Sequence, residues 1–147
     1  MLATSLVWRA YSSHGADVEA ADTKGWTALH SAAFSQREDV VAVLLMHGAS
    51  IKAVESRGQT PLHVATERGN KPIAALLLDD GADVNSRDNE GNTPLHEATA
   101  HLGDVSAIRL LLERGANPLA KARESTTFRR CRRSWWRLWD STRMAIN

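Results

Sequence analysis

Short blocks of apolar residues at helical spacing follow one another along the chain, and polar stretches that contain glycine separate them. In one block, Val40, Val41, Leu44 and Leu45 recur at the intervals that place side chains on one face of a helix. Two later blocks have the same kind of spacing: Ile73, Leu76, Leu77 and Leu78, then Ala107, Ile108, Leu110, Leu111 and Leu112. The pattern predicts three short amphipathic helices, the first over about residues 39–46.

A second kind of helix is predicted ahead of each block, and the stretch Thr60-Pro61-Leu62 shows why. Thr60 can cap the free amide groups of the first turn. Pro61 has no amide hydrogen to leave unpaired there, and its φ is already helical. Leu62 and Ala65 are three residues apart and therefore share one face. We expect this helix to run over residues 61–68.

The same motif recurs along the chain at a fixed interval of 33 residues. A second marker, Gly-Ala, keeps nearly the same step at residues 15–18, 48–49, 81–85 and 115–117. Two independent markers in register over about 100 residues indicate a repeat protein. The three copies of the first motif are Gly25-Trp26-Thr27-Ala28-Leu29-His30, Gly58-Gln59-Thr60-Pro61-Leu62-His63 and Gly91-Asn92-Thr93-Pro94-Leu95-His96.

This period and the pattern T-P-L-H-x-A resemble the ankyrin-repeat family, over roughly residues 5–121. The resemblance implies an all-α solenoid of helix–turn–helix units with short β-hairpin-like fingers. Residues 1–21 match only the outer helix and finger of a unit, so we expect a partial repeat there. Three full units are predicted at residues 22–54, 55–87 and 88–121, and residues 122–147 follow as a basic, tryptophan-rich tail.

Two departures from the family pattern are visible in the sequence. Gln36 stands where the family usually has a glycine between the two helices, and glutamine tolerates a positive φ poorly. We therefore expect the turn at Gln36 to be the least stable of the three inter-helix turns. In the third unit the step from His96 to Gly103 is one residue longer than in the second, which predicts a local bulge in an inner helix over residues 94–102.

Stacking is required because one helix pair cannot bury its apolar face alone, and about three units are needed. We expect Leu29, Leu62 and Leu95 to point into the shared core. The tail carries Phe128, Cys131, Trp135 and Leu138 on one helical face, so it can serve as a cap for the last unit. Disorder, an altered reading frame, or a patch for acidic partners are the alternatives.

Charge separates the tail from the rest of the chain. The formal net charge is +1, but residues 1–120 hold 10 Lys/Arg and 15 Asp/Glu, giving −5, and residues 121–147 hold 8 and 2, giving +6. Cys131 is the single cysteine, which excludes an internal disulfide. The first residues lack the basic segment of a secretory signal, and no apolar run approaches the ~20 residues of a membrane span. The compartment is unknown, and an intracellular one, cytoplasm or nucleus, is favoured.

His30, His63 and His96 recur once per unit, and either a metal ladder or a structural role is conceivable. Neighbouring packed helices lie about 8–10 Å apart, whereas each imidazole nitrogen must lie about 2 Å from a shared zinc ion. We therefore expect structural imidazoles that tie each inner helix to a neighbouring loop. No metal and no cofactor are expected. The sequence contains no phosphate-binding loop, G-x-S-x-G or H-E-x-x-H motif, so we expect no enzyme.

The resemblance implies a concave partner-binding surface made of the finger tips and the exposed side of the inner helices. Trp26 and Phe34 stand out on it, because aromatic residues and arginine are the usual interface anchors. The alternative is that Trp26 only covers a loop and Phe34 only fills the groove. Mapped residue by residue, the surface comprises Thr23, Lys24, Trp26, Phe34 and Ser35, then Ser56, Arg57, Gln59, Glu67 and Arg68, and finally Asn89, Glu90, Asn92, Ala100 and His101.

Asn85 resembles the finger asparagine that some eukaryotic ankyrin proteins carry in hydroxylated form. We instead expect it to bond within its own turn.

Together these observations predict a non-enzymatic scaffold that binds another protein, of unknown identity, and no small-molecule substrate. Two alternatives remain. The chain can be a fragment of a larger ankyrin-repeat protein whose activity lies elsewhere. It can also bind nucleic acid or an anionic membrane through the basic tail.

Overall fold

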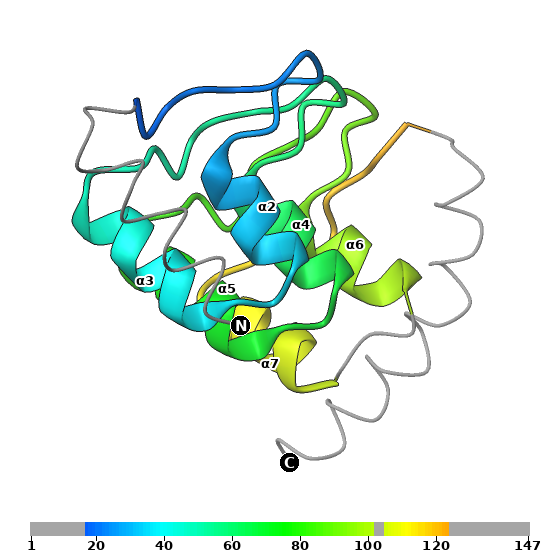
Figure 1. Cartoon of the computed structure of the whole chain (residues 1–147). Helices are drawn as coiled ribbons and strands as arrows, with labels where there is room; N and C mark the ends of the chain where they lie inside the picture. Colours follow the sequence, from blue (N-terminus) through cyan, green and yellow to red (C-terminus); the bar gives the residue numbers. More distant parts are fainter. Residues whose placement is uncertain (1–16, 102–104, 124–147) are drawn as a thin grey trace.

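The computed structural model describes residues 17–101 and 105–123, and this part of the chain folds into six α-helices (Figure 1). They alternate between short helices of 7 residues and longer ones of 9 residues. In chain order they are α2 (Ala28–Phe34), α3 (Glu38–Met46), α4 (Pro61–Glu67), α5 (Lys71–Asp79), α6 (Pro94–Ala100) and α7 (Val105–Glu113).

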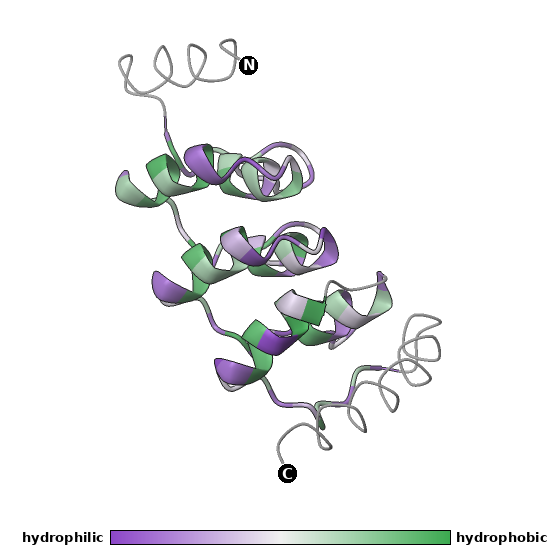
Figure 2. Ribbon diagram, turned by 90° about the horizontal axis from the view of Figure 1, so that it is seen from below, coloured by the Kyte–Doolittle hydropathy of each residue, from purple (hydrophilic) through white to green (hydrophobic). Residues whose placement is uncertain are grey.

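The helices form three consecutive pairs that stack in one direction (Figure 2). The inner helices α2, α4 and α6 pack against one another in order, and the outer helices α3, α5 and α7 do the same. Each inner helix also packs against the outer helix that follows it. The predicted all-α solenoid is confirmed, and α5 in the middle contacts both neighbouring outer helices.

Fingers connect each outer helix to the next inner helix. Their tips close by backbone hydrogen bonds such as the one from the Asp22 N–H to the Trp26 carbonyl, at 3.0 Å. Within the described residues, the fingers contain a single antiparallel bridge, Ala21–Thr27, and no regular strand. Neighbouring fingers are joined in turn, because the Asn89 N–H donates to the Arg57 carbonyl at 2.9 Å.

Gly58 shows how closely two fingers approach. Its φ is +76°, and a Cβ added there would lie 2.5 Å from Oδ1 of Asn89. A side chain at residue 58 would therefore be both strained and in collision with the next finger.

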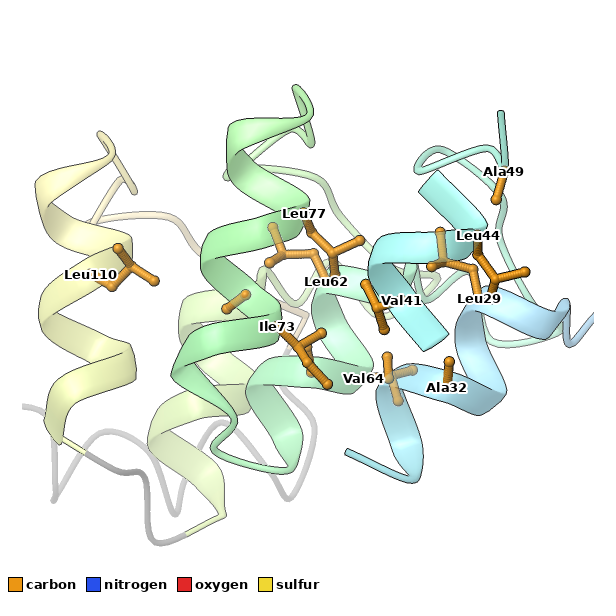
Figure 3. Close-up of a cluster of buried hydrophobic side chains, with 13 residues drawn as sticks. Leu29, Ala32, Val41, Leu44, Ala49, Leu62, Val64, Ile73, Leu77 and Leu110 are labelled. Carbon is orange, nitrogen blue, oxygen red and sulfur yellow. The ribbon is translucent and has the colours of Figure 1, made fainter. Parts of the chain in front are cut away.

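The core lies between the two rows of helices and runs through all three units (Figure 3). Leu29, Leu62 and Leu95 are buried, as expected for one leucine per inner helix. Val41 and Leu44 of α3 and Ile73 and Leu77 of α5, all four fully buried, share one cluster with Leu29 and Leu62, whereas Leu95 packs in a second cluster with Ile108 and Leu111 of α7. The helical spacing of the apolar blocks thus identified the inward faces correctly.

The inner helices end slightly earlier than predicted. α4 ends at Glu67 rather than at residue 68, and α6 ends at Ala100 rather than at residue 102. The bulge predicted within residues 94–102 is absent from Pro94–Ala100, which are regular α-helix, and residue 102 lies outside the described residues. The outer helix predicted in residues 1–21 and the cap predicted for Phe128, Cys131, Trp135 and Leu138 also lie outside them. No helix in the described ranges has the length and apolar character needed to cross a membrane.

The turn between α2 and α3 has the positive φ at Gln36 that the sequence predicted. Gln36 has a φ of 57°, and the equivalent residue of the second unit, Gly69, has a φ of 69°. A residue with a Cβ pays a steric penalty in this left-handed region, and glycine does not.

We expect Gln36→Gly to raise the free energy of unfolding by about 0.5–1 kcal/mol, because it removes that penalty. Urea denaturation followed by circular dichroism measures the change. Gly69→Ala, at the matched position of the second unit, should change the stability in the opposite direction. Equal midpoints for wild type and Gln36→Gly would show that this turn carries no strain.

Candidate partner-binding surface

The recurring histidines connect each inner helix to the next finger. His63 is fully buried, and its Nε2 donates to the backbone carbonyl of Asn92 at 3.0 Å. His30 makes the equivalent bond to the carbonyl of Gln59, also at 3.0 Å. His96 bonds the backbone of Ala120 in the segment that follows α7. The imidazoles therefore hold successive units together through backbone atoms.

The protonation state of these rings follows from their partners. Nδ1 of His63 accepts a hydrogen bond from the Thr60 N–H at 3.2 Å, so the proton of a neutral ring sits on Nε2 and points to the carbonyl. The same arrangement closes the first turn of α2 and α6, from Thr27 and Thr93. Burial lowers the pKa of His30, His63 and His96 below the usual value, which stabilises the neutral form.

These contacts leave no role for the ladder as a metal site. Both ring nitrogens of His30 and of His63 are occupied by hydrogen bonds. In residues 17–101 and 105–123, no three His, Cys, Asp or Glu side chains lie close enough together to hold a metal ion.

Two aromatic residues and an arginine form a connected group at the first unit. The rings of Trp26 and Phe34 meet edge to face with centroids 5.7 Å apart, and Trp26 also lies 5.7 Å from the ring of His30. The guanidinium carbon of Arg68, from the second unit, lies 4.6 Å from the centroid of the Phe34 ring. Trp26 is half-buried, whereas Phe34 is 44% exposed at the end of α2. Phe34 thus presents an apolar ring to solvent between two units.

A group of carboxylates lies between the second and third units. His101 Nε2 is 3.7 Å from Oε2 of Glu97 and 4.0 Å from Oε1 of Glu67. Burial, together with the nearby charges of Glu67 and Asp88, raises the pKa of Glu97 to about 7. Arg57 opposes this shift.

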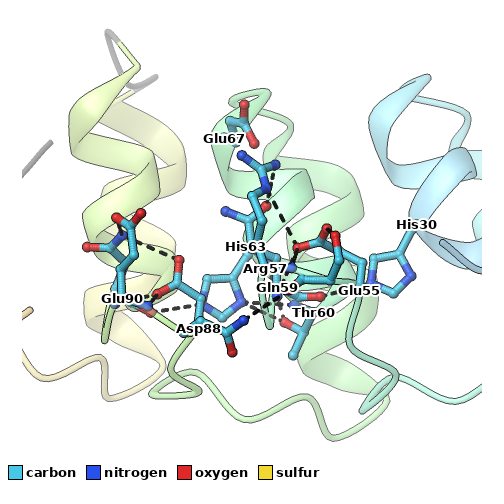
Figure 4. A network of polar contacts seen from close by, with 12 residues as sticks. His30, Glu55, Arg57, Gln59, Thr60, His63, Glu67, Asp88 and Glu90 are labelled. Carbon is cyan, nitrogen blue, oxygen red and sulfur yellow. Dashed lines mark hydrogen bonds and ion pairs between the residues drawn. The ribbon is translucent and has the colours of Figure 1, made fainter. Parts of the chain in front are cut away.

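Figure 4 shows the residues beneath this group, with Glu55, Arg57 and Gln59 on the second finger and Asp88 and Glu90 on the third. The Arg57 guanidinium lies 3.7 Å from the Glu55 carboxylate and donates to Oε1 of Gln59 at 2.9 Å. The second finger therefore uses its own arginine internally.

Most of the predicted surface residues are accessible. Three of them, Trp26, Glu67 and Ala100, are half-buried, and ten are exposed. Contacts join many of them across units, from Phe34 to Arg68 and from Glu67 to His101. The exposed members are Thr23, Lys24, Phe34, Ser35, Ser56, Arg57, Arg68, Asn89, Glu90 and His101.

Two predicted surface residues, Gln59 and Asn92, are buried instead; each is 3% exposed. The Gln59 side chain points toward the next inner helix, and the Asn92 side chain turns back into its own finger. The Gln59 amide donates to Oε1 of Glu97 at 3.4 Å, and the Asn92 amide donates to the Asp88 carboxylate at 3.3 Å. The sequence placed them correctly on the fingers but gave no sign of this inward orientation.

Glu97 was missed by the sequence analysis, although a signal was present. It follows His96 directly, and the residue at the same place in the second unit is Val64, which is buried. A carboxylate at a position that another unit fills with valine is an exception to the repeat pattern. Such exceptions often have a functional role.

The prediction that Asn85 bonds within its own turn is wrong. Its side chain does not close its own turn but reaches the next finger. Its Oδ1 accepts from the Asn117 N–H at 2.7 Å, and its Nδ2 donates to the Gly115 carbonyl at 3.2 Å. The reason is that successive fingers stack at the repeat distance, which brings residues 30–32 positions apart into contact.

Comparison with known families agrees with this architecture. A family model described as ankyrin repeats (3 copies) matches residues 3–55 and 50–122. The chain belongs to the ankyrin-repeat family. No curated protein matches the chain. Ankyrin repeats are generally modules for protein–protein interaction, and ankyrin-repeat proteins are typically non-enzymatic scaffolds.

Proposed function

We propose that this ankyrin-repeat protein is a non-enzymatic scaffold that binds a partner protein on the surface formed by its finger tips and the exposed side of α2, α4 and α6. The observation that supports this most directly is Phe34. Phe34 is 44% exposed and lies between Trp26 and an arginine of the next unit. Exposed aromatic residues next to arginine are the residue types that usually anchor interfaces.

Phe34 and Trp26 differ in how cleanly they test the proposal. Trp26 packs against the hydrophobic core as well as against His30, so its removal also affects folding. Phe34 contributes less to the core because nearly half of it is open to solvent.

Phe34→Ala should therefore weaken capture of a partner protein at least tenfold, as expected for an anchor worth more than about 1.4 kcal/mol, with little change in the thermal unfolding midpoint. The measurement is affinity capture on the immobilised full chain, followed by titration of each recovered protein. Met46→Ala is the matched control, since Met46 is 84% exposed but lies on the outer helix α3. Equal capture by all three chains would contradict binding through the inner surface. A large loss of stability in Phe34→Ala would assign the ring to packing instead.

A further inference from the structure

Glu97 is a buried carboxylate with few partners. Its side chain is only 6% exposed, and the Gln59 amide, at 3.4 Å, gives it a long hydrogen bond. His101 lies near its second oxygen at 3.7 Å, beyond ordinary hydrogen-bond distance. A buried carboxylate is costly unless it is paired and hydrogen-bonded. Glu97 is therefore a group that a further donor would stabilise.

The groups around Glu97 supply more negative than positive charge. Glu67 at the end of α4 shares His101 with it, and Asp88 and Glu90 face it from the third finger. Of the arginines, Arg57 is engaged by Glu55 and Gln59.

Arg68 is engaged as well, because its guanidinium lies over the Phe34 ring. Its position leaves the pair Glu67 and Glu97 with one imidazole between them. A cation placed there would offset part of this negative charge.

The apolar ring of Phe34 lies one unit away from Glu67 and two units away from Glu97. Neighbouring packed helices are about 8–10 Å apart, so one short peptide segment can reach both. Phe34 belongs to α2, Glu67 to α4 and Glu97 to α6, and these three helices pack in that order. The surface thus changes from aromatic to acidic along the direction of the stack.

We propose that the partner presents an arginine or lysine to Glu67 and Glu97, next to an apolar side chain that covers Phe34. This inference rests on the proposed scaffold function and names the chemistry of its partner. The partner's cation forms charge-assisted hydrogen bonds with the two carboxylates. Its apolar neighbour removes the exposed face of Phe34 from water.

Binding of the partner's cation is coupled to the ionisation of Glu97. With a pKa of about 7, Glu97 is mostly protonated at pH 6 and mostly ionised at pH 8. Binding of a cation selects the ionised form, so affinity should rise about tenfold from pH 6 to pH 8. The charged and titratable groups of this chain that face Glu97 are Glu67, Asp88, Glu90, Arg57 and His101.

A random peptide library displayed on phage tests the partner's chemistry without a known partner. Selection on the immobilised full chain should enrich peptides in which arginine or lysine lies within a few residues of an aromatic or aliphatic residue. The affinity of the best peptide is then measured by fluorescence anisotropy. Glu97→Gln and Glu67→Gln should each weaken it about tenfold, and Glu97→Gln should abolish the increase between pH 6 and pH 8. Glu113→Gln, an exposed glutamate of the outer helix α7, is the matched control and should change neither.

The possible failures are distinguishable. Peptides that lose affinity with Phe34→Ala but carry no basic residue would overturn this inference and leave the scaffold function standing. Peptides indifferent to Phe34, Glu67 and Glu97 would overturn both. If the full chain enriches no peptide, the assignment of a basic partner segment to this surface is wrong.

Discussion

His63→Ala is expected to lower the free energy of unfolding by about 4 kcal/mol, a large part of the stability of a small domain. The imidazole is fully buried and bonds the Thr60 N–H at one end and the Asn92 carbonyl at the other. Its removal leaves both backbone groups without this partner and opens a cavity, and each of these costs is on the order of 1–3 kcal/mol. Urea denaturation followed by circular dichroism measures the loss.

The matched control is His47→Ala. His47 is exposed at the end of α3, and its Nδ1 bonds the Val43 carbonyl of the same helix. We expect a loss of less than about 0.5 kcal/mol there, as for most surface substitutions. A loss below 1 kcal/mol for His63→Ala would show that the imidazole connection between units is not a main source of stability.

Stability should fall as the pH is lowered below about 6.5. Burial lowers the pKa of His30, His63 and His96 in the folded chain, while the unfolded chain titrates near 6.5. The unfolded state therefore binds more protons below pH 6.5. The stability contributed by the neutral rings is complete above that pH and is lost as the pH falls toward the folded pKa values. Each histidine contributes a slope of up to about 1.4 kcal/mol per pH unit, so three give up to about 4.

Glu97 acts in the opposite direction over part of this range. Its folded pKa is about 7 and its ordinary value is 4.5, so the folded chain retains a proton that the unfolded chain has already released. This group therefore destabilises the fold as the pH rises from 4.5 to 7. Glu97→Gln should remove that contribution and make the decrease between pH 6.5 and pH 5 steeper than in wild type.

Urea midpoints at half-unit pH intervals, for wild type and Glu97→Gln, measure both contributions. A wild-type midpoint independent of pH over this window, together with an unchanged slope in Glu97→Gln, would contradict the assignment of the neutral histidines. The thermal midpoint provides a second measure of the same change.

The two predictions depend on the same architectural fact, namely that much of the polar bonding in this molecule connects one unit to the next. His30 reaches Gln59, His63 reaches Asn92, and Asn85 reaches Asn117. Each bond spans about one repeat in sequence. A unit removed from the stack would lose these partners as well as part of its core, which is why the units are expected to unfold together.

The repeated features of the fold were predictable because they depend on local chemistry. A threonine and a proline at a helix start, a leucine at helical spacing and a glycine at a turn act within a few residues of themselves. Leu62 was placed in the core correctly on this basis, and the φ of Gln36 followed from a missing glycine. The 33-residue period then determined which segments stack.

The wrong predictions concern polar side chains whose surroundings come partly from a neighbouring unit. Gln59 and Asn92 have polar side chains at finger tips, which favours exposure in a single unit. They are buried because Gln59 bonds Glu97 of the next inner helix and Asn92 bonds Asp88 of its own finger, while His30 and His63 of the preceding inner helices bond their backbone carbonyls. Asn85 was assigned to its own turn for the same reason, whereas its partners belong to the following finger.

The sequence by itself determined the family, the helix pairs, the inward leucines and the histidine at each inner helix, since all of these are encoded in short motifs that repeat in register. The tertiary structure alone decided that Glu97 lies buried beside Glu67 and His101, and that Arg68 covers Phe34. Glu67 and His101 come from different units, and so do Phe34 and Arg68. Stacking brings the first pair within 4.0 Å and the second within 4.6 Å, and only in the stacked units do these groups act on one another.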